Sequence, residues 1–570
     1  MSTMRHLLPI IALAFALPLH AQTGDPAGPG GQYYFQGVYN PVIADVKKID
    51  MRPLPFDSII PAQPLNYQMI PAKFEVPARV DTIAAAKVNV QATQEKLYKG
   101  YVKAGFGLYT TPLAELYYDQ TRDRDRGFGL HVKHLSSNGG IDDAGPSDYG
   151  RNRIEGFYKT FLPHHEVGGN VVYDRRRVNY YGFDPVAFDS LGLDVPSSAD
   201  LKQFYNDIGF AARVKSLYGD SARIAHAVGM EVHTYSNRQQ SRETNLRLTA
   251  DLSKADGSET YSAGVLIDNN AYRGKPAEDV ADLRQNGTLI GLTPSVSTEG
   301  SKYVVKVGVG MYLDAMGKTT FHFFPNAYLS YSLFGDMLVP YLGVDGRRQR
   351  NGFRSLTQEN PWLVAAPNLK NSSLMYDIHG GLRGSFSSTM GFDVRVSALR
   401  WKDKPLYVNE TVLSFGNAFV PVYDEVNVLD IMGQLNYAVG ERANVSGRID
   451  IYTYRTDEQA EAWNLPPYEL ALVARYDLRD KLILKAEAQF MGRRRALVNA
   501  VSDMQTLTAV DPVEVDLDGY LDLYLGAEYR YNKRLSVFLD VSNLSASKYE
   551  RWADHPVQRT LFMGGATYAF

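Results

Sequence analysis

Apolar and polar residues alternate with a period of two from residue 98 to the end of the chain. The alternation is regular in residues 101–108, 482–490 and 521–530. A period of two places successive side chains on opposite faces of a β-strand. The alternating segments often run for ten to fifteen residues, whereas strands of soluble proteins average about five or six. Their polar face carries full charges and Tyr, so we expect the strands of a transmembrane β-barrel around a wet lumen.

The first 21 residues predict an export signal. Arg5 supplies a positive start, residues 7–19 form a short apolar core, and Ala21 is a suitable last residue before cleavage. The core is too short to span about 30 Å of hydrocarbon, and Pro9 and Pro18 interrupt it. No other stretch approaches about 18 consecutive apolar residues, so an exported chain of this kind is either soluble or a membrane β-barrel.

Composition excludes several classes of protein. The chain of 570 residues contains no Cys, which rules out a disulfide scaffold, a thiolate metal site, a catalytic Cys and a lipid anchor on Cys. Its 60 basic and 63 acidic residues give a net charge of −3, so we expect no nucleic-acid partner. The 38 Tyr and 48 Gly favour β-structure with many tight turns.

Residues 22–97 differ from the alternating part of the chain. Nine prolines lie between Pro26 and Pro77. Because proline fixes φ and lacks an N–H donor, this segment cannot form a regular sheet or a long helix. We therefore divide the chain into a signal peptide, residues 1–21, a proline-rich periplasmic or lumenal arm, residues 22–97, and a barrel, residues 98–570.

Short and long connections alternate strictly within the predicted barrel. Short periplasmic turns and long outer loops are typical of outer-membrane barrels. Ten short turns join twenty strands, and one strand at each end of the series gives an all-β antiparallel barrel of about 22 strands with both ends in the periplasm. Examples of the predicted long outer loops are residues 136–151, 175–202, 269–284, 346–373, 400–428, 492–518 and 544–558.

The end of the chain, RTLFMGGATYAF, places Phe562, Tyr568 and the terminal Phe570 on one face. It resembles the C-terminal signal that outer-membrane barrels present to the barrel-assembly machinery. The preceding VSNL at 541–544, followed by Tyr549, is similar to the penultimate strand of TonB-dependent receptors. The stretch LYKGYVKAGFGLYTTPLAELYYD also resembles the plug-poor receptor-like barrels common in Bacteroidota.

This resemblance implies a 22-stranded barrel in the outer membrane of a Gram-negative bacterium, with the barrel-assembly machinery as a partner during biogenesis. TonB-dependent receptors normally carry a folded plug that is larger than the arm of residues 22–97. We also find no convincing TonB box in the sequence. The resemblance therefore supports the barrel and its location, and it does not support TonB-energised uptake.

Three arginine clusters each follow an ascending strand and are expected to ring the outer rim. The guanidinium fork suits phosphate geometry. We favour contacts with outer-membrane lipids, above all lipopolysaccharide phosphates, because such head groups lie at the rim. A selectivity ring for anionic substrates is the alternative. The candidates are Arg175, Arg176, Arg177, Arg347, Arg348, Arg350, Arg493, Arg494 and Arg495.

The sequence predicts no catalytic, cofactor or metal site. His131 and His134 are three apart on a strand and face opposite sides. A 22-stranded barrel without contents would leave a wide hole, so the arm, inward-folded loops or a partner must close it. We expect a receptor-like barrel that passes or binds a solute, with the arm as a reduced plug, and not an enzyme. The alternative is a sealed scaffold or accessory subunit of an outer-membrane assembly, secretion or surface-lipoprotein complex.

Overall fold

The computed structural model describes residues 98–570 apart from residues 121–122, 191–193, 219–222, 277–279, 411–415, 441 and 504–507. The predicted signal peptide, residues 1–21, and the predicted arm, residues 22–97, lie outside the described residues. Both therefore stay predictions.

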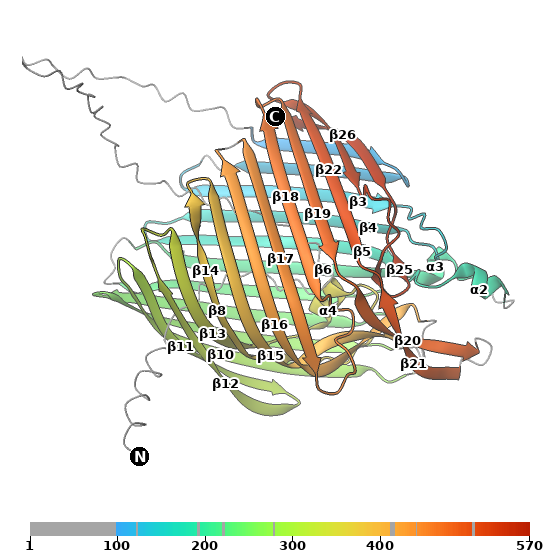
Figure 1. Cartoon of the computed structure of the whole chain (residues 1–570), viewed down its shortest axis with the longest axis horizontal. Helices are drawn as coiled ribbons and strands as arrows, with labels where there is room; N and C mark the ends of the chain where they lie inside the picture. Colours follow the sequence, from blue (N-terminus) through green and yellow to red (C-terminus); the bar gives the residue numbers. More distant parts are fainter. Residues whose placement is uncertain are drawn as a thin grey trace, which may run out of the picture. The chain divides into compact units, whose positions relative to one another are not determined.

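The described chain forms a closed antiparallel barrel of 22 strands (Figure 1). Each strand pairs with its neighbour in the chain, and the last strand pairs with the first, from Tyr101–Ala569 to Gly107–Met563. The predicted fold class and strand number are confirmed. The barrel strands are β1 Gly100–Gly107, β2 Thr111–Gln120, β3 Arg126–Ser137, β4 Tyr149–Phe161, β5 His165–Asn179, β6 Lys202–Ser216, β7 Ala225–Ser236, β8 Arg242–Asp256, β9 Glu259–Gly274, β10 Leu283–Glu299, β11 Tyr303–Met316, β12 Lys318–Tyr331, β13 Leu338–Gln349, β14 Ser372–Ser387, β15 Met390–Glu410, β16 Ala418–Val439, β17 Ala443–Thr456, β18 Tyr468–Leu478, β19 Leu482–Met491, β22 Tyr520–Arg530, β23 Leu535–Ser542 and β26 Leu561–Ala569.

The wall of the barrel is apolar outside and polar inside, as strand β16 illustrates. Leu429, Ile431 and Leu435 are each more than 40% exposed, although they are large and apolar. Asp430, Gln434 and Asn436 alternate with them, and Asp430 is 6% exposed. An exposed apolar face around a barrel whose last strand pairs with its first matches a lipid environment.

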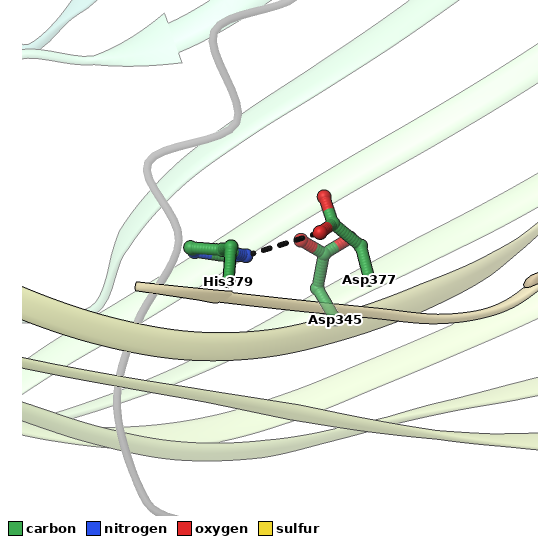
Figure 2. A group of neighbouring side chains, drawn as sticks. All are labelled: Asp345, Asp377 and His379. Atoms are coloured by element: carbon green, nitrogen blue, oxygen red, sulfur yellow. Dashed lines mark ion pairs between the residues drawn. The ribbon is translucent and has the colours of Figure 1, made fainter. Parts of the chain in front are cut away.

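Polar side chains cover the lumen face of the strands. On β13 and β14, Asp345, Asp377 and His379 point to the same side of the sheet (Figure 2). The next outward residues, Ile378 and Leu382, are exposed and apolar. Pairing in register therefore concentrates charged groups inside the barrel and keeps them away from lipid.

The two ends of the barrel differ in their connections. At one end, called here the turn end, all ten connections are short, and both described chain ends meet there through a hydrogen bond from the Lys99 backbone N to the Phe570 carbonyl O (2.9 Å). Among the described residues, the opposite end, the loop end, carries three short helices and two small hairpins (Figure 1). These elements are α2 Pro185–Ser190, α3 Ser198–Leu201, α4 Phe353–Glu359, β20 Arg494–Asp503 with β21 Thr508–Leu517, and β24 Glu550–Trp552 with β25 His555–Pro556.

The prediction that short and long connections alternate strictly is wrong at three places. The connections 108–110, 237–241 and the lone residue Gly317 are short and lie at the loop end. Gly317 has φ of 76°, a backbone conformation that suits glycine and lets β11 and β12 join directly. The predicted number of strands is still correct, because each of these short connections reverses the direction of the chain.

The prediction that residues 400–428 form an outer loop is also wrong. Strand β15 continues to Glu410 and β16 already begins at Ala418. The alternating apolar residues of this segment are buried: Leu406 and Val426 pack with Trp463 in a cluster at the loop end. The two strands extend as a paired ribbon for this reason.

Among the described residues, no helix is long and apolar enough to cross a membrane.

Candidate functional site: the closed loop end

The connection between β13 and β14, residues 350–371, enters the opening at the loop end and is called the mouth loop here. Its helix α4 begins after Gly352 and ends at Glu359. Asn360 precedes Pro361, and a residue before proline is disfavoured in the α conformation, so the helix stops there. Phe353 and Leu356 on α4 are 0% and 2% exposed. The apolar side chains of α4 are therefore buried in the protein core, unlike those of a solvated connection.

The barrel wall supplies the N-terminal cap of α4. Gly352 has no side chain to accept hydrogen bonds from the first turn. Glu243 on β8 takes this role and accepts from the backbone N of Phe353 (2.5 Å) and of Arg354 (3.3 Å). A carboxylate is favoured at a helix N-terminus by the unpaired N–H groups and the helix dipole. The contact fixes α4 to β8.

The backbone of the mouth loop crosses the opening of the barrel. Trp362 Nε1 donates to the Asn179 carbonyl O at the end of β5 (2.8 Å). The Phe419 backbone N on β16 donates to the Trp362 carbonyl O (2.9 Å). Strands β5 and β16 are eleven strands apart in the ring of 22, so they stand on opposite sides. One residue of the mouth loop thus joins opposite walls of the barrel.

A group of rings, called the aromatic cap here, seals the crossing point. The Trp362 ring lies 4.4 Å from the His555 ring, and the Phe419 and Tyr407 rings lie 5.5 and 5.2 Å from that of Trp552. Phe419, Tyr407 and Trp552 are 2% exposed or less. The cap consists of Tyr181, Trp362, Tyr407, Phe419, Trp552 and His555.

Three connections distant in sequence meet in this cap. Tyr181 follows β5, Trp362 belongs to the mouth loop, and His555 lies in the connection 543–560. Close packing requires glycine at position 182, because a Cβ there would lie 2.3 Å from His555 Cε1. The cap is therefore a tertiary core built from loops.

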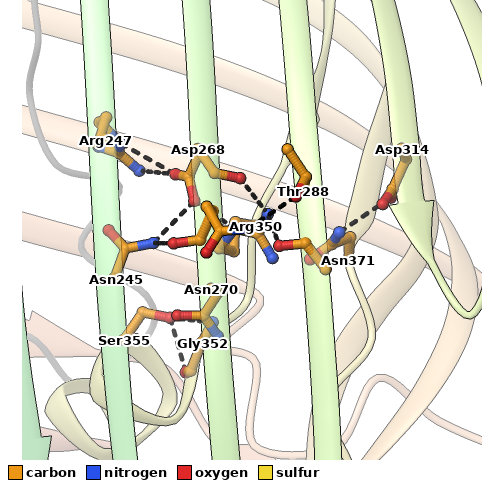
Figure 3. A network of polar contacts seen from close by, with 12 residues as sticks. Asn245, Arg247, Asp268, Asn270, Thr288, Asp314, Arg350, Gly352, Ser355 and Asn371 are labelled. Carbon is orange, nitrogen blue, oxygen red and sulfur yellow. Dashed lines mark hydrogen bonds and ion pairs between the residues drawn. The ribbon is translucent and has the colours of Figure 1, made fainter.

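Buried ion pairs anchor the base of the mouth loop (Figure 3). Arg350 Nε lies 2.5 Å from Asp268 Oδ1 on β9, and these side chains are 6% and 1% exposed. Arg348 Nε lies 2.8 Å from Asp314 Oδ2 on β11. Asn371, at the other end of the loop, donates to the same Asp314 carboxylate (2.9 Å). Both ends of the mouth loop are thus held to the lumen wall by charge-assisted hydrogen bonds.

A cavity of about 170 Å³ lies between α4 and strands β4 to β7. Its walls are strongly polar, and Arg354 of α4 pairs there with Asp207 of β6 (2.7 Å). A space of this size and polarity can hold several water molecules or a small polar group. The ionisable residues lining it are Arg151, Arg153, Asp174, Asp207, His233 and Arg354.

The predicted arginine clusters split between the inside and the outside of the protein. Arg348 and Arg350 hold the mouth loop, as described above. Arg494, which is 3% exposed, donates to the carbonyl O atoms of Arg551 (2.6 Å) and Glu550 (2.5 Å). The side chains of these three arginines are therefore turned into the protein and away from lipid phosphates.

The other six arginines differ in exposure, and Arg177 is paired with Asp148 (3.2 Å). Arg175 and Arg177 share the outward face of β5 with exposed Val171, whereas Arg176 alternates to the lumen face. The remaining three side chains are 45 to 65% exposed; they are Arg347, Arg493 and Arg495. Lipopolysaccharide contact stays a prediction for the outward-facing arginines.

The predicted C-terminal signal residues share a face of β26. Phe562, Tyr568 and Phe570 are each more than 40% exposed on the apolar exterior. Recognition by the barrel-assembly machinery stays a prediction, as do surface lipoproteins as partners.

Sequence reasoning missed the mouth loop as a functional element. A signal was present: residues 353–369 include Phe353, Leu356, Trp362, Leu363 and Leu369, an unusual density of large apolar residues for an outer loop. All but Trp362 are 3% exposed or less. Their partners on distant strands could not be identified from the sequence.

Three solved structures resemble the chain over most of its length. The ferripyoverdine receptor of the outer membrane of Pseudomonas aeruginosa shares 12% identity with a TM-score of 0.62, over 83% of this chain and 72% of the receptor. The FrpB iron transporter from Neisseria meningitidis shares 9% with a TM-score of 0.63, over 84% and 82%. The siderophore receptor PirA from Acinetobacter baumannii shares 11% with a TM-score of 0.61, over 84% and 81%. No protein-family model and no curated protein matches the sequence.

The chain has the barrel fold of the TonB-dependent receptors. A closed barrel of 22 strands with an apolar exterior belongs in the outer membrane of a Gram-negative bacterium. The likeness is to receptors and a transporter, none of them named as an enzyme. The resemblance to Bacteroidota barrels stays a prediction.

The stability of the loop end is expected to depend on pH through His555. Burial among the rings of the aromatic cap lowers the pKa of His555 from 6.5 to about 4. Between these two pKa values the unfolded loop binds the proton more strongly than the folded cap does. The free energy of unfolding of the cap therefore falls by up to about 3 kcal/mol as the pH falls from 6.5 to 4. Tryptophan emission during denaturation at several pH values measures this loss, which His555→Gln should abolish.

Glu359 on α4 is expected to change the stability of the loop end with pH in the direction opposite to His555. Burial raises the pKa of Glu359 from 4.5 to about 7. Its contribution to stability is therefore present below pH 4.5 and is lost as the pH rises towards 7. Glu359→Gln removes this opposing slope, so the two variants separate the two groups. Equal pH profiles in wild type and His555→Gln would contradict the assignment to His555.

Proposed function

We propose that the protein is a gated outer-membrane receptor that binds a solute at the loop end and passes it through the barrel when the mouth loop moves. The crossing of the opening by Trp362, which joins β5 to β16, carries this proposal. A loop that crosses the opening obstructs the path of a solute, so the proposed passage requires displacement of the loop. The polar cavity beneath α4 provides a place for a solute group on the lumen side.

The structural neighbours support the same function. They are named as receptors for ferripyoverdine and siderophores and as an iron transporter. Fold alone does not imply function, and the alternative of a sealed scaffold makes a different prediction about conductance. A scaffold stays closed after removal of its mouth loop, whereas a gated barrel opens.

The test is KCl conductance in planar bilayers. The ends of the mouth loop are close, since Asn351 Nδ2 donates to the Lys370 carbonyl O (2.9 Å), so a short Gly-Ser linker can replace residues 353–369. Both this replacement and the intact loop are compared in a chain that lacks residues 22–97, which removes any contribution of the arm. We expect rare, brief openings with the intact loop and a steady, large conductance with the linker.

A disulfide that holds the loop in place provides the matched control. Ser241 Oγ donates to the Ala365 carbonyl O (2.7 Å), both side chains are small, and the chain contains no other Cys. In the Ser241→Cys/Ala365→Cys variant, oxidation should abolish the rare openings and reduction should restore them. If the chain without arm and mouth loop stays closed, the gated-receptor proposal fails and the sealed scaffold is favoured.

A further inference from the structure

We propose that Asp345, Asp377 and His379 on the lumen wall bind a divalent transition-metal ion (Figure 2). One ligand atom from each of the three residues lies within 4.8 Å of the other two. Among the described residues this is the one such group of three or more His, Asp or Glu side chains. The proposal does not depend on the proposed transport function.

Strand register brings the three side chains together. Asp345 on β13 and Asp377 on β14 are direct cross-strand partners, and His379 is partnered by Gly343. Positions 377 and 379 are two apart and therefore share a face, as do directly opposed residues of antiparallel strands. All three side chains are carried by two paired strands of a closed barrel, so their positions are fixed by the sheet and not by a flexible loop.

Two of the ligand atoms are buried and lack hydrogen bonds. His379 Nδ1 and Asp377 Oδ1 face each other as an ion pair 3.4 Å apart, and neither atom has a hydrogen bond among the described residues. His379 is 7% exposed. Buried polar atoms are nearly always satisfied, and an ion is one of the accepted explanations for an exception. With metal–ligand bonds of about 2.1 Å, neighbouring ligands of a tetrahedral ion lie about 3.4 Å apart, which matches this pair.

The surroundings favour a cation and make room for the imidazole. Two carboxylates face each other at this point. The negative charge of each one disfavours the ionised form of the other unless a cation lies nearby. Arg347 lies 3.8 Å from Asp345, and Arg395, the other cation close to the cluster, is paired with Asp430 (3.4 Å). A Cβ at Gly343 would lie 2.4 Å from His379 Nε2, so glycine there creates the space that the ring occupies.

The donor set indicates the class of ion. One imidazole nitrogen and two carboxylate oxygens suit Zn²⁺, Co²⁺, Fe²⁺ or Mn²⁺, whereas Ca²⁺ demands six or more oxygen ligands and Mg²⁺ near-ideal octahedral oxygen coordination. Three protein ligands leave at least one position open to water or to a donor group of a solute in the lumen.

Cobalt absorption provides the test. The full chain, without a histidine tag, is purified in detergent, treated with EDTA and titrated with Co²⁺, whose visible spectrum reports the ligand set. We expect saturation at one ion per chain and displacement by Zn²⁺ but not by Mg²⁺ or Ca²⁺. Asp377→Asn and His379→Gln should each weaken binding at least tenfold, and Asp345→Asn should change the spectrum.

His233→Gln is the matched control. His233 also lies beside an aspartate on the lumen wall, but its Nδ1 is hydrogen-bonded to Asp207 (3.1 Å), which Arg354 neutralises. This variant should bind Co²⁺ as the wild type does. Heat-dependent migration on SDS gels verifies that every variant is folded. The proposal is overturned if the folded triple variant Asp345→Asn/Asp377→Asn/His379→Gln binds Co²⁺ as tightly as the wild type, or if the wild type does not bind it.

Discussion

Replacing Asp268 with alanine is expected to release the mouth loop and to open the barrel. The Asp268 carboxylate is 1% exposed and pairs with Arg350 (2.5 Å), which itself is 6% exposed. Removal of one partner of a buried pair leaves an uncompensated charge and costs about 3–5 kcal/mol. If the loop lifts to hydrate Arg350, the open state gains roughly 10²- to 5 × 10³-fold in population. Conductance of the chain lacking residues 22–97 measures this gain.

The control for Asp268→Ala is an exposed pair at the same end of the barrel. Asp282 lies 2.7 Å from Arg273, whose side chain is 58% exposed. Surface pairs contribute about 0–1 kcal/mol, so Asp282→Ala should leave conductance nearly unchanged. Arg247 also pairs with Asp268 (3.0 Å), but its side chain is 45% exposed and stays hydrated. Adding Arg350→Met to Asp268→Ala removes the buried charge of Arg350 and should restore most of the closure. If Asp268→Ala conducts no more than Asp282→Ala, the ion pair does not hold the loop.

Replacing Phe353 with alanine is expected to loosen α4 from the wall without unfolding the barrel. The Phe353 side chain is 0% exposed and lies against the rings of Tyr272 (5.4 Å), Tyr235 (5.6 Å) and Tyr205 (6.3 Å). A cavity of this kind costs about 3–5 kcal/mol. Tryptophan emission, to which the two cap tryptophans contribute, should therefore change at a lower denaturant concentration than in the wild type.

Phe353→Leu provides a graded comparison. It keeps most of the apolar volume and should cost roughly 1–2 kcal/mol. Migration of the folded barrel on SDS gels should be the same for wild type, Phe353→Leu and Phe353→Ala, because the mouth loop contributes no strand to the ring. Identical tryptophan transitions in all three proteins would show that α4 is not packed in the mouth.

The strand architecture could be predicted because it depends on local pattern. Side chains alternate between lipid and lumen along each strand, so the period of two is visible in the sequence, and short turns mark each reversal at one end. The prediction failed where pairing outside the lipid decided the structure. Residues 401–410 and 418–428 extend β15 and β16 because Leu406 and Val426 are buried against Trp463, which lies more than thirty residues later in the chain.

The candidate sites depend on contacts that no local pattern records. The arginine clusters were visible as neighbours in sequence, but alternation and bulged register send Arg348 and Arg350 to buried aspartates on β11 and β9. Likewise, Asp377 and His379 are two apart on one strand, a spacing that is visible, whereas Asp345 joins them only through the pairing of β13 with β14.

Alternation along the strands is enough to predict an antiparallel barrel of about 22 strands with an apolar exterior, because each strand must satisfy its backbone through its neighbours and expose apolar residues to lipid. The crossing of the loop end by residues 350–371 could be found only in the folded barrel. It rests on contacts between walls eleven strands apart, and such contacts depend on where pairing of the first and last strands places each strand, not on the residues next to them in the chain.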